Sequence, residues 1–113
     1  MILQVLQIIA VIGTILTGLV SLIRPRAVKG FTGLSAEGGR GITEIRAILG
    51  SVFVALGAAP LILNAPAAYQ TLGITYLVVG GTRAVSMFVD KSVVQSNVIS
   101  LVVEIVFGVV LVL

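Results

Sequence analysis

Residues 2–23 read ILQVLQIIAVIGTILTGLVSLI, an apolar run without a charged side chain. A helix needs about 20 predominantly apolar residues to cross the roughly 30 Å hydrocarbon core of a bilayer. A signal peptide would instead begin with basic residues and have a shorter apolar core. Met1–Gln7 contains no basic side chain, and the apolar run continues to Ile23. We therefore expect residues 2–23 to form a membrane span.

Three further runs of suitable length follow, at about residues 42–63, 67–89 and 97–113. The first of these ends at Asn64-Ala65-Pro66, which predicts a compact turn, because proline cannot continue a helix and biases the residue before it away from the helical conformation. The four spans occupy most of the 113 residues and leave no room for a second domain. The sequence therefore predicts a single all-α domain over residues 1–113, an integral membrane four-helix bundle.

The composition supports this class. Apolar residues make up 58% of the chain and charged residues 10%, with a mean hydropathy of +1.25, whereas ordinary soluble domains carry about 25% charged residues. The chain has no Cys and no His, which excludes disulfides, thiol chemistry and the usual zinc and haem ligands. We expect no metal, no cofactor and no catalytic residues, and hence no enzymatic activity. Nothing in the sequence names a substrate.

The distribution of Lys and Arg predicts the orientation. The connection between the first two spans contains Arg24, Arg26, Lys29 and Arg40, the third connection contains Lys91, and the second contains neither residue type. Basic connections are retained on the cytoplasmic side, so we expect both chain ends on the non-cytoplasmic side. The net charge of +3 lies in these connections, where it suits anionic membrane lipids. Nucleic acid is therefore not an expected partner.

The first connection is rich in glycine. Residues 36–41 read AEGGRG, but they lack the spacing and terminal Lys-Ser or Lys-Thr of a phosphate-binding loop. We interpret them as a flexible turn into the second span. Val28–Leu34 combines Phe31 and Leu34 with basic and small residues, a composition that predicts a short segment along the headgroup layer.

Four ionisable residues fall within the apolar runs: Glu44 and Arg46 in the second, Arg83 in the third and Glu104 in the fourth. At 1.5 Å per residue they lie roughly 3 to 10 Å from the cytoplasmic ends of their spans. A charged side chain inside a bilayer needs a partner that compensates it, contact with water or a position near the membrane interface. Because these four share a depth and their charges sum to zero, they predict one network between the helices.

The helical faces agree with this network. Each span after the first has one face that combines its charge with small or polar residues. These faces are Glu44, Ala47, Gly50, Val54 and Gly57; Tyr76, Gly80, Arg83, Met87 and Asp90; and Asn97, Ser100, Glu104, Phe107 or Gly108, and Leu111. We expect these faces to meet inside the bundle, with Tyr76, Ser86, Asp90, Asn97 and Ser100 as supporting polar groups.

Several of these motifs are similar to those of a known family. Glu44-Ile45-Arg46-Ala47, Arg83-Ala84 with Asp90, and Ser96-Asn97 with Glu104-Ile105 resemble the domain of unknown function 4345 family over about residues 2–113. The resemblance implies a small bacterial membrane protein of four helices, related to the DoxX-like group, some of whose members accompany quinone-linked oxidoreductases. It brings no established activity. Lys91 stands where such sequences commonly have a glycine.

These observations predict a protein of the bacterial inner membrane with a structural or accessory role, as a homo-oligomer or as a subunit of a larger membrane complex. In this interpretation the four charges fix the register of the helices. The alternative is a cytoplasmic-leaflet pocket in which Arg46, Arg83 and Glu104 bind a lipid, a quinone or a similar amphiphile. A third interpretation is proton-coupled transport that uses Glu104.

Overall fold

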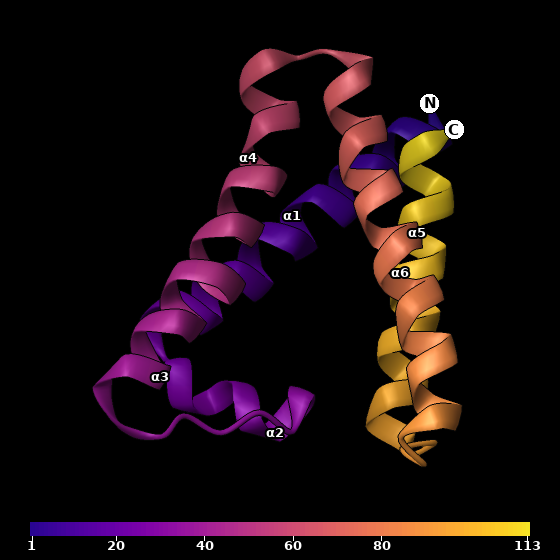
Figure 1. The fold of residues 1–113 in the computed structure, drawn as a ribbon. Helices are drawn as coiled ribbons and strands as arrows, with labels where there is room; N and C mark the ends of the chain where they lie inside the picture. The colour runs from indigo at the N-terminus through magenta and orange to yellow at the C-terminus, as the bar shows by residue number, and fades with distance from the viewer. The chain divides into compact units, whose positions relative to one another are not determined.

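The computed structural model describes residues 1–113, which form helices and short connections without any strand (Figure 1). Four helical stretches are long and apolar enough to cross a membrane. These are α1 (Ile2–Ile23), the stretch Gly38–Leu63, α5 (Pro66–Val89) and α6 (Gln95–Val112). The predicted all-α class and the four potential spans are confirmed. Membrane insertion, the side of each terminus and the packing of all four helices in one bundle stay predictions.

The second stretch begins at Gly38, earlier than the expected start near residue 42. It consists of α3 (Gly38–Glu44), a π-helical segment η2 (Ile45–Val52) and α4 (Phe53–Leu63). Glycine disfavours helix, which is why the sequence suggested a later start. The fourth helix likewise begins at Gln95 rather than near residue 97.

The connections contain short helices of their own. A 3₁₀ turn, η1 (Pro25–Val28), leads into a single helical turn, α2 (Lys29–Thr32), which ends at Gly33 with φ +76°. The first connection is thus more helical than expected. Between α4 and α5, Asn64 adopts φ +49° and donates its backbone N–H to the Pro60 carbonyl at 3.0 Å. The predicted compact turn is confirmed there.

The chain divides into two compact units. The α5–α6 unit contains residues 1–10 and 65–113, and the α3–α4 unit contains residues 11–64. Helix α1 contributes its first residues to the α5–α6 unit and the remainder to the α3–α4 unit. The single-domain organisation stays a prediction, and each unit is described separately below.

In the α5–α6 unit the two long helices run antiparallel, side by side (Figure 1). Glycines allow this close packing. A Cβ on Gly73 would lie 2.8 Å from Val112 Cγ1, one on Gly80 2.9 Å from Ile105 Cδ1, and one on Gly108 2.6 Å from Leu77 Cδ2. Tyr76 and Phe107 pack edge to face, with ring centroids 5.6 Å apart. The Gln7 side chain, on the first part of α1, donates to the Val110 carbonyl at 3.1 Å.

In the α3–α4 unit, the rest of α1 packs on η2 and α4. A Cβ on Gly18 would lie 2.8 Å from the Gly50 carbonyl oxygen and 2.8 Å from the Val54 amide nitrogen. One on Gly57 would lie 2.7 Å from Ile15 Cγ1. The predicted small-residue face of the second span is therefore a contact face.

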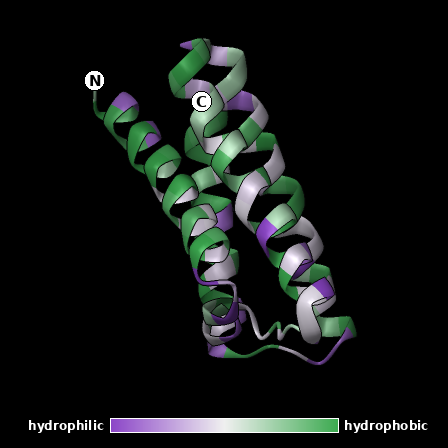
Figure 2. Cartoon of the chain, turned by 90° about the vertical axis from the view of Figure 1, so that its left-hand side faces the viewer, coloured by the Kyte–Doolittle hydropathy of each residue, from purple (hydrophilic) through white to green (hydrophobic).

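The outward faces of the helices are apolar. Figure 2 shows the colour of hydrophobic residues along every long helix, interrupted by white and purple residues. On α6 the exposed side chains Ile99, Val102, Val106 and Val109 follow one another at three- and four-residue steps. Residues at this spacing share one helix face, so α6 presents a continuous ridge of β-branched side chains. We call these four residues the α6 ridge.

Candidate functional site: the Arg83–Glu104 clamp and the groove beside it

The two charged residues of the α5–α6 unit that the sequence analysis singled out form an ion pair. Arg83 on α5 donates from Nε to Glu104 Oε1 at 2.7 Å and from Nη2 to Glu104 Oε2 at 2.8 Å. This is the two-pronged geometry in which arginine binds a carboxylate most strongly. The Glu104 side chain is 10% exposed, whereas the Arg83 side chain is 31% exposed. Water reaches the carboxylate less than the guanidinium, so Glu104 depends on Arg83 to compensate its charge.

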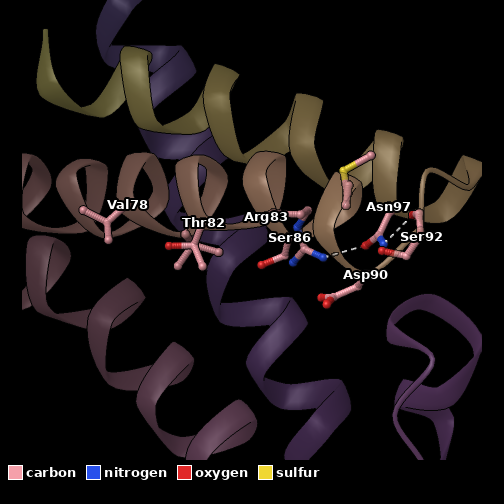
Figure 3. A pocket seen from close by; sticks show the side chains of 9 residues that line it. Val78, Thr82, Arg83, Ser86, Asp90, Ser92 and Asn97 are labelled. Atoms are coloured by element: carbon pink, nitrogen blue, oxygen red, sulfur yellow. Dashed lines mark hydrogen bonds between the residues drawn. The ribbon is translucent and has the colours of Figure 1, made fainter.

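Asn97 extends the pair toward the connection between the helices. Arg83 Nη1 donates to Asn97 Oδ1 at 2.8 Å, and Asn97 Nδ2 donates to the Ser92 carbonyl oxygen at 2.9 Å (Figure 3). Arg83 is thereby tied to α6 at two levels and, through Asn97, to the residues that join the helices. We call Arg83, Glu104 and Asn97 the clamp.

The clamp compensates its own charge. Both oxygens of the nearly buried carboxylate accept from one guanidinium, and no buried side-chain polar atom is left without a partner. Such an arrangement meets the requirement for burying an ion pair, which is that the remaining hydrogen-bonding capacity is also used. It fixes the register of α5 against α6.

A groove of about 440 Å³ runs along α5 beside the clamp (Figure 3). Its apolar end lies at Val78 and its polar end at Asp90. The lining residues are Val78, Val79, Thr82, Arg83, Ser86, Met87, Asp90, Ser92 and Asn97. Glu104 does not line this groove. The pocket of Arg46, Arg83 and Glu104 expected from the sequence stays a prediction.

Glu44 and Arg46, the charged residues predicted in the second span, belong to the α3–α4 unit and have their own partners there. Glu44 forms an exposed ion pair with Arg40, one helical turn earlier. Arg46 Nε donates to the Leu22 carbonyl oxygen at 3.1 Å, in the last turn of α1, where backbone carbonyls lack partners within the helix. The network of all four charges stays a prediction.

The supporting polar residues have different positions. Asn97 belongs to the clamp, Ser86 and Asp90 line the groove, and Tyr76 packs on Phe107. Ser100 is half-buried on α6.

One packing row, on α1, was not predicted from the sequence. Thr14, Gly18 and Ser21 are all buried there. Their three- and four-residue spacing was visible in the sequence, but the absence of a charge on α1 kept it out of the argument.

These features define an all-α chain with four potential membrane spans, in which a charge clamp joins the third to the fourth. The chain belongs to the family described as Domain of unknown function (DUF4345), which matches residues 2–113. No curated protein and no solved structure matches the chain. The family resemblance noted above is thus confirmed, and the DoxX-like and bacterial relationships stay predictions.

Proposed function

We propose that this chain is a multi-pass protein of the bacterial inner membrane with a structural or accessory role. In this proposal the basic connections are cytoplasmic and both termini lie on the other side. The protein acts as a homo-oligomer or as a subunit of a larger membrane complex.

The observation that carries this proposal is the contrast between the two sides of α6. On its inner side Glu104 is nearly buried and bound by Arg83, so these two charges hold α6 against α5. On its outer side the α6 ridge leaves Ile99, Val102 and Val106 more than half exposed. Membrane helices associate through close van der Waals packing, and a ridge of stiff β-branched side chains suits such an interface.

Disulfide cross-linking in native membranes tests the proposal, because the chain has no cysteine of its own. Val102→Cys places a thiol on the α6 ridge, and Leu111→Cys places one at a fully buried position of the same helix. We expect oxidation to link Val102→Cys to a second copy or to a distinct membrane protein, and to leave Leu111→Cys unlinked. A lone monomer in mild detergent, together with no cross-link from Val102→Cys, would contradict the proposal.

The groove beside the clamp favours a second candidate function, the binding of an amphiphile. From Val78 to Asp90 its lining changes from aliphatic to polar over about 18 Å of helix. A molecule with an apolar tail and a polar head, such as a lipid or a quinone, has the same gradient. Serine hydroxyl, asparagine amide and aspartate carboxylate groups at the polar end offer hydrogen bonds to its head.

Native mass spectrometry of the protein released from mild detergent tests this second candidate. Ser86→Leu fills the polar half of the groove, whereas Val85→Leu adds one methylene group at an exposed neighbouring position outside it. We expect a retained amphiphile in the wild type and in Val85→Leu, and its loss in Ser86→Leu. Wild-type protein without a retained small molecule would refute amphiphile binding.

Proton-coupled transport receives no support from the clamp, because Arg83 binds both oxygens of Glu104. A coupling acid has to exchange its proton with water and substrate, and Glu104 is 8% exposed.

A further inference from the structure

Three arginine side chains line a single hollow in the α3–α4 unit. The hollow encloses about 490 Å³ where α1 ends and η1, α3 and η2 approach one another. Its lining residues are Arg24, Pro25, Arg26, Ala27, Ile42 and Arg46. The three cations come from different elements: Arg24 from the junction after α1, Arg26 from η1 and Arg46 from η2.

The positive charge of this hollow is not compensated by the protein. The Arg24 and Arg26 side chains form no ion pair or hydrogen bond. Arg46 uses its Nε on the Leu22 carbonyl, which leaves both terminal NH₂ groups of its guanidinium to bind elsewhere. Neither nearby acid in the sequence, Glu37 or Glu44, lines this hollow. Glu44 is paired with Arg40 and lines a different hollow.

The C-terminal end of α1, whose Leu22 carbonyl accepts from Arg46, contributes an opposing field. A helix end carries about half an elementary charge, against three formal positive charges in the lining. The hollow is therefore strongly electropositive, and an anion that entered it would relieve the repulsion between neighbouring guanidinium groups.

We propose that this hollow binds the phosphate headgroup of an anionic phospholipid. The guanidinium fork matches two phosphate oxygens at once. Pro25, Ala27 and Ile42 add apolar surface beside the arginines, which suits the glycerol backbone of a lipid better than a free ion. The hollow begins at the end of α1, a potential membrane span, and basic pockets at the ends of membrane helices are suited to anionic headgroups.

Lipid titration of the full-length protein in detergent micelles tests the proposal, with bound lipid counted by native mass spectrometry. We expect phosphatidylglycerol to bind about tenfold more tightly than phosphatidylcholine, and Arg24→Gln and Arg26→Gln each to weaken phosphatidylglycerol about fivefold, as expected for one cation at a lipid surface. Both arginines are exposed, so neither substitution disturbs packing. Arg26→Lys keeps the charge but loses the fork, and we expect it to bind less tightly than the wild type.

Lys29→Gln is the matched control, because Lys29 is an exposed cation of the same connection that does not line the hollow. We expect it to leave phosphatidylglycerol binding unchanged. Equal losses in Lys29→Gln and Arg26→Gln would mean that net charge alone attracts the lipid, and would overturn the site. Displacement of the lipid by inorganic phosphate at millimolar concentration would assign the hollow to a free anion instead. No preference for phosphatidylglycerol in the wild type would also overturn the proposal.

Discussion

At the scale of single residues, the clamp is asymmetric. Glu104 is nearly buried, while about a third of the Arg83 side chain is exposed. Removing one member of a buried ion pair leaves the other charge without compensation, whereas replacing both with apolar residues of similar volume is often neutral. If the pair is effectively buried, a variant that lacks one charge is therefore less stable than a variant in which both residues are apolar.

We predict that Arg83→Met destabilises the protein by about 3 kcal/mol, at the lower end for a broken buried pair, because the nearly buried Glu104 carboxyl group then loses both of its hydrogen-bond donors. The double variant Arg83→Met with Glu104→Leu should recover most of this loss. Reversible unfolding in mixed detergent micelles measures both values. The control is Arg40→Met, which breaks the exposed Arg40–Glu44 pair and should have no measurable effect. Equal losses in Arg83→Met and Arg40→Met would show that the clamp is not a buried pair.

Arg46 acts on a single backbone group. Its Nε holds the Leu22 carbonyl in the last turn of α1. We predict that Arg46→Met loosens this turn and speeds hydrogen exchange of the Ile23 and Arg24 amides about fivefold, the equivalent of one modest hydrogen bond. Mass-spectrometric exchange of the peptide that covers the end of α1 measures the change. Unaltered exchange there would show that the bond does not restrain the helix end.

At the scale of elements, glycine decides which helices come into close contact. Gly73 faces the Val112 backbone nitrogen, so an added Cβ would lie 2.9 Å from an atom that cannot move aside easily. Gly81, on the same helix, has open space around its Cβ position. The two positions provide a matched pair in one helix.

We predict that Gly73→Ala destabilises the α5–α6 unit by about 1–3 kcal/mol, the range for overpacking. Gly81→Ala should leave the stability unchanged or raise it by up to about 1 kcal/mol, because alanine favours helix over glycine. Unfolding in mixed micelles again supplies both values. The same loss in both variants would mean that helix propensity rather than the α5–α6 contact governs the result.

The sequence predicted most of the elements because helix periodicity is a strong local signal. The faces that contain Arg83, Glu104, Gly50 and Gly57 followed from three- and four-residue spacing alone. The π-helical segment Ile45–Val52 was not predicted, because its hydrogen-bond pattern leaves no distinct mark on that spacing.

The partners of individual charges were harder to predict. Arg40 was assigned to a connection, although it lies in α3 and pairs with Glu44. The hollow at Arg24, Arg26 and Arg46 depends on how η1 and η2 turn their side chains, which is tertiary information that the sequence does not display. Arg83 and Glu104, two members of the predicted four-charge network, do bind each other, and the sequence indicated this contact because both charges lie at similar depths in neighbouring spans.

At the scale of the whole molecule, the distribution of Lys and Arg predicts on which side of the membrane each connection lies. Five of the seven Lys and Arg residues lie at Arg24, Arg26, Lys29, Arg40 and Lys91, in or beside the first and third connections. The Asn64-Ala65 turn between α4 and α5 has none. Retention of basic segments on the cytoplasmic side therefore predicts that this turn and both termini lie on the opposite side.

We predict that a membrane-impermeant thiol reagent labels Ala67→Cys in intact bacterial cells and labels Ser35→Cys only after lysis. Both positions are exposed, and the chain has no native cysteine, so each label reports one site. Ala67 is the second residue of α5, beside the uncharged turn, whereas Ser35 lies between α2 and α3 in the basic connection. Exchanging the charges supplies the control: removing Arg24, Arg26 and Lys29 while adding lysines at the exposed positions Leu63 and Gln70 should reverse the labelling, because the orientation follows the bias in Lys and Arg. If Ser35→Cys reacts in intact cells and Ala67→Cys does not, the orientation is wrong. The arginine-lined hollow would then face the outer leaflet.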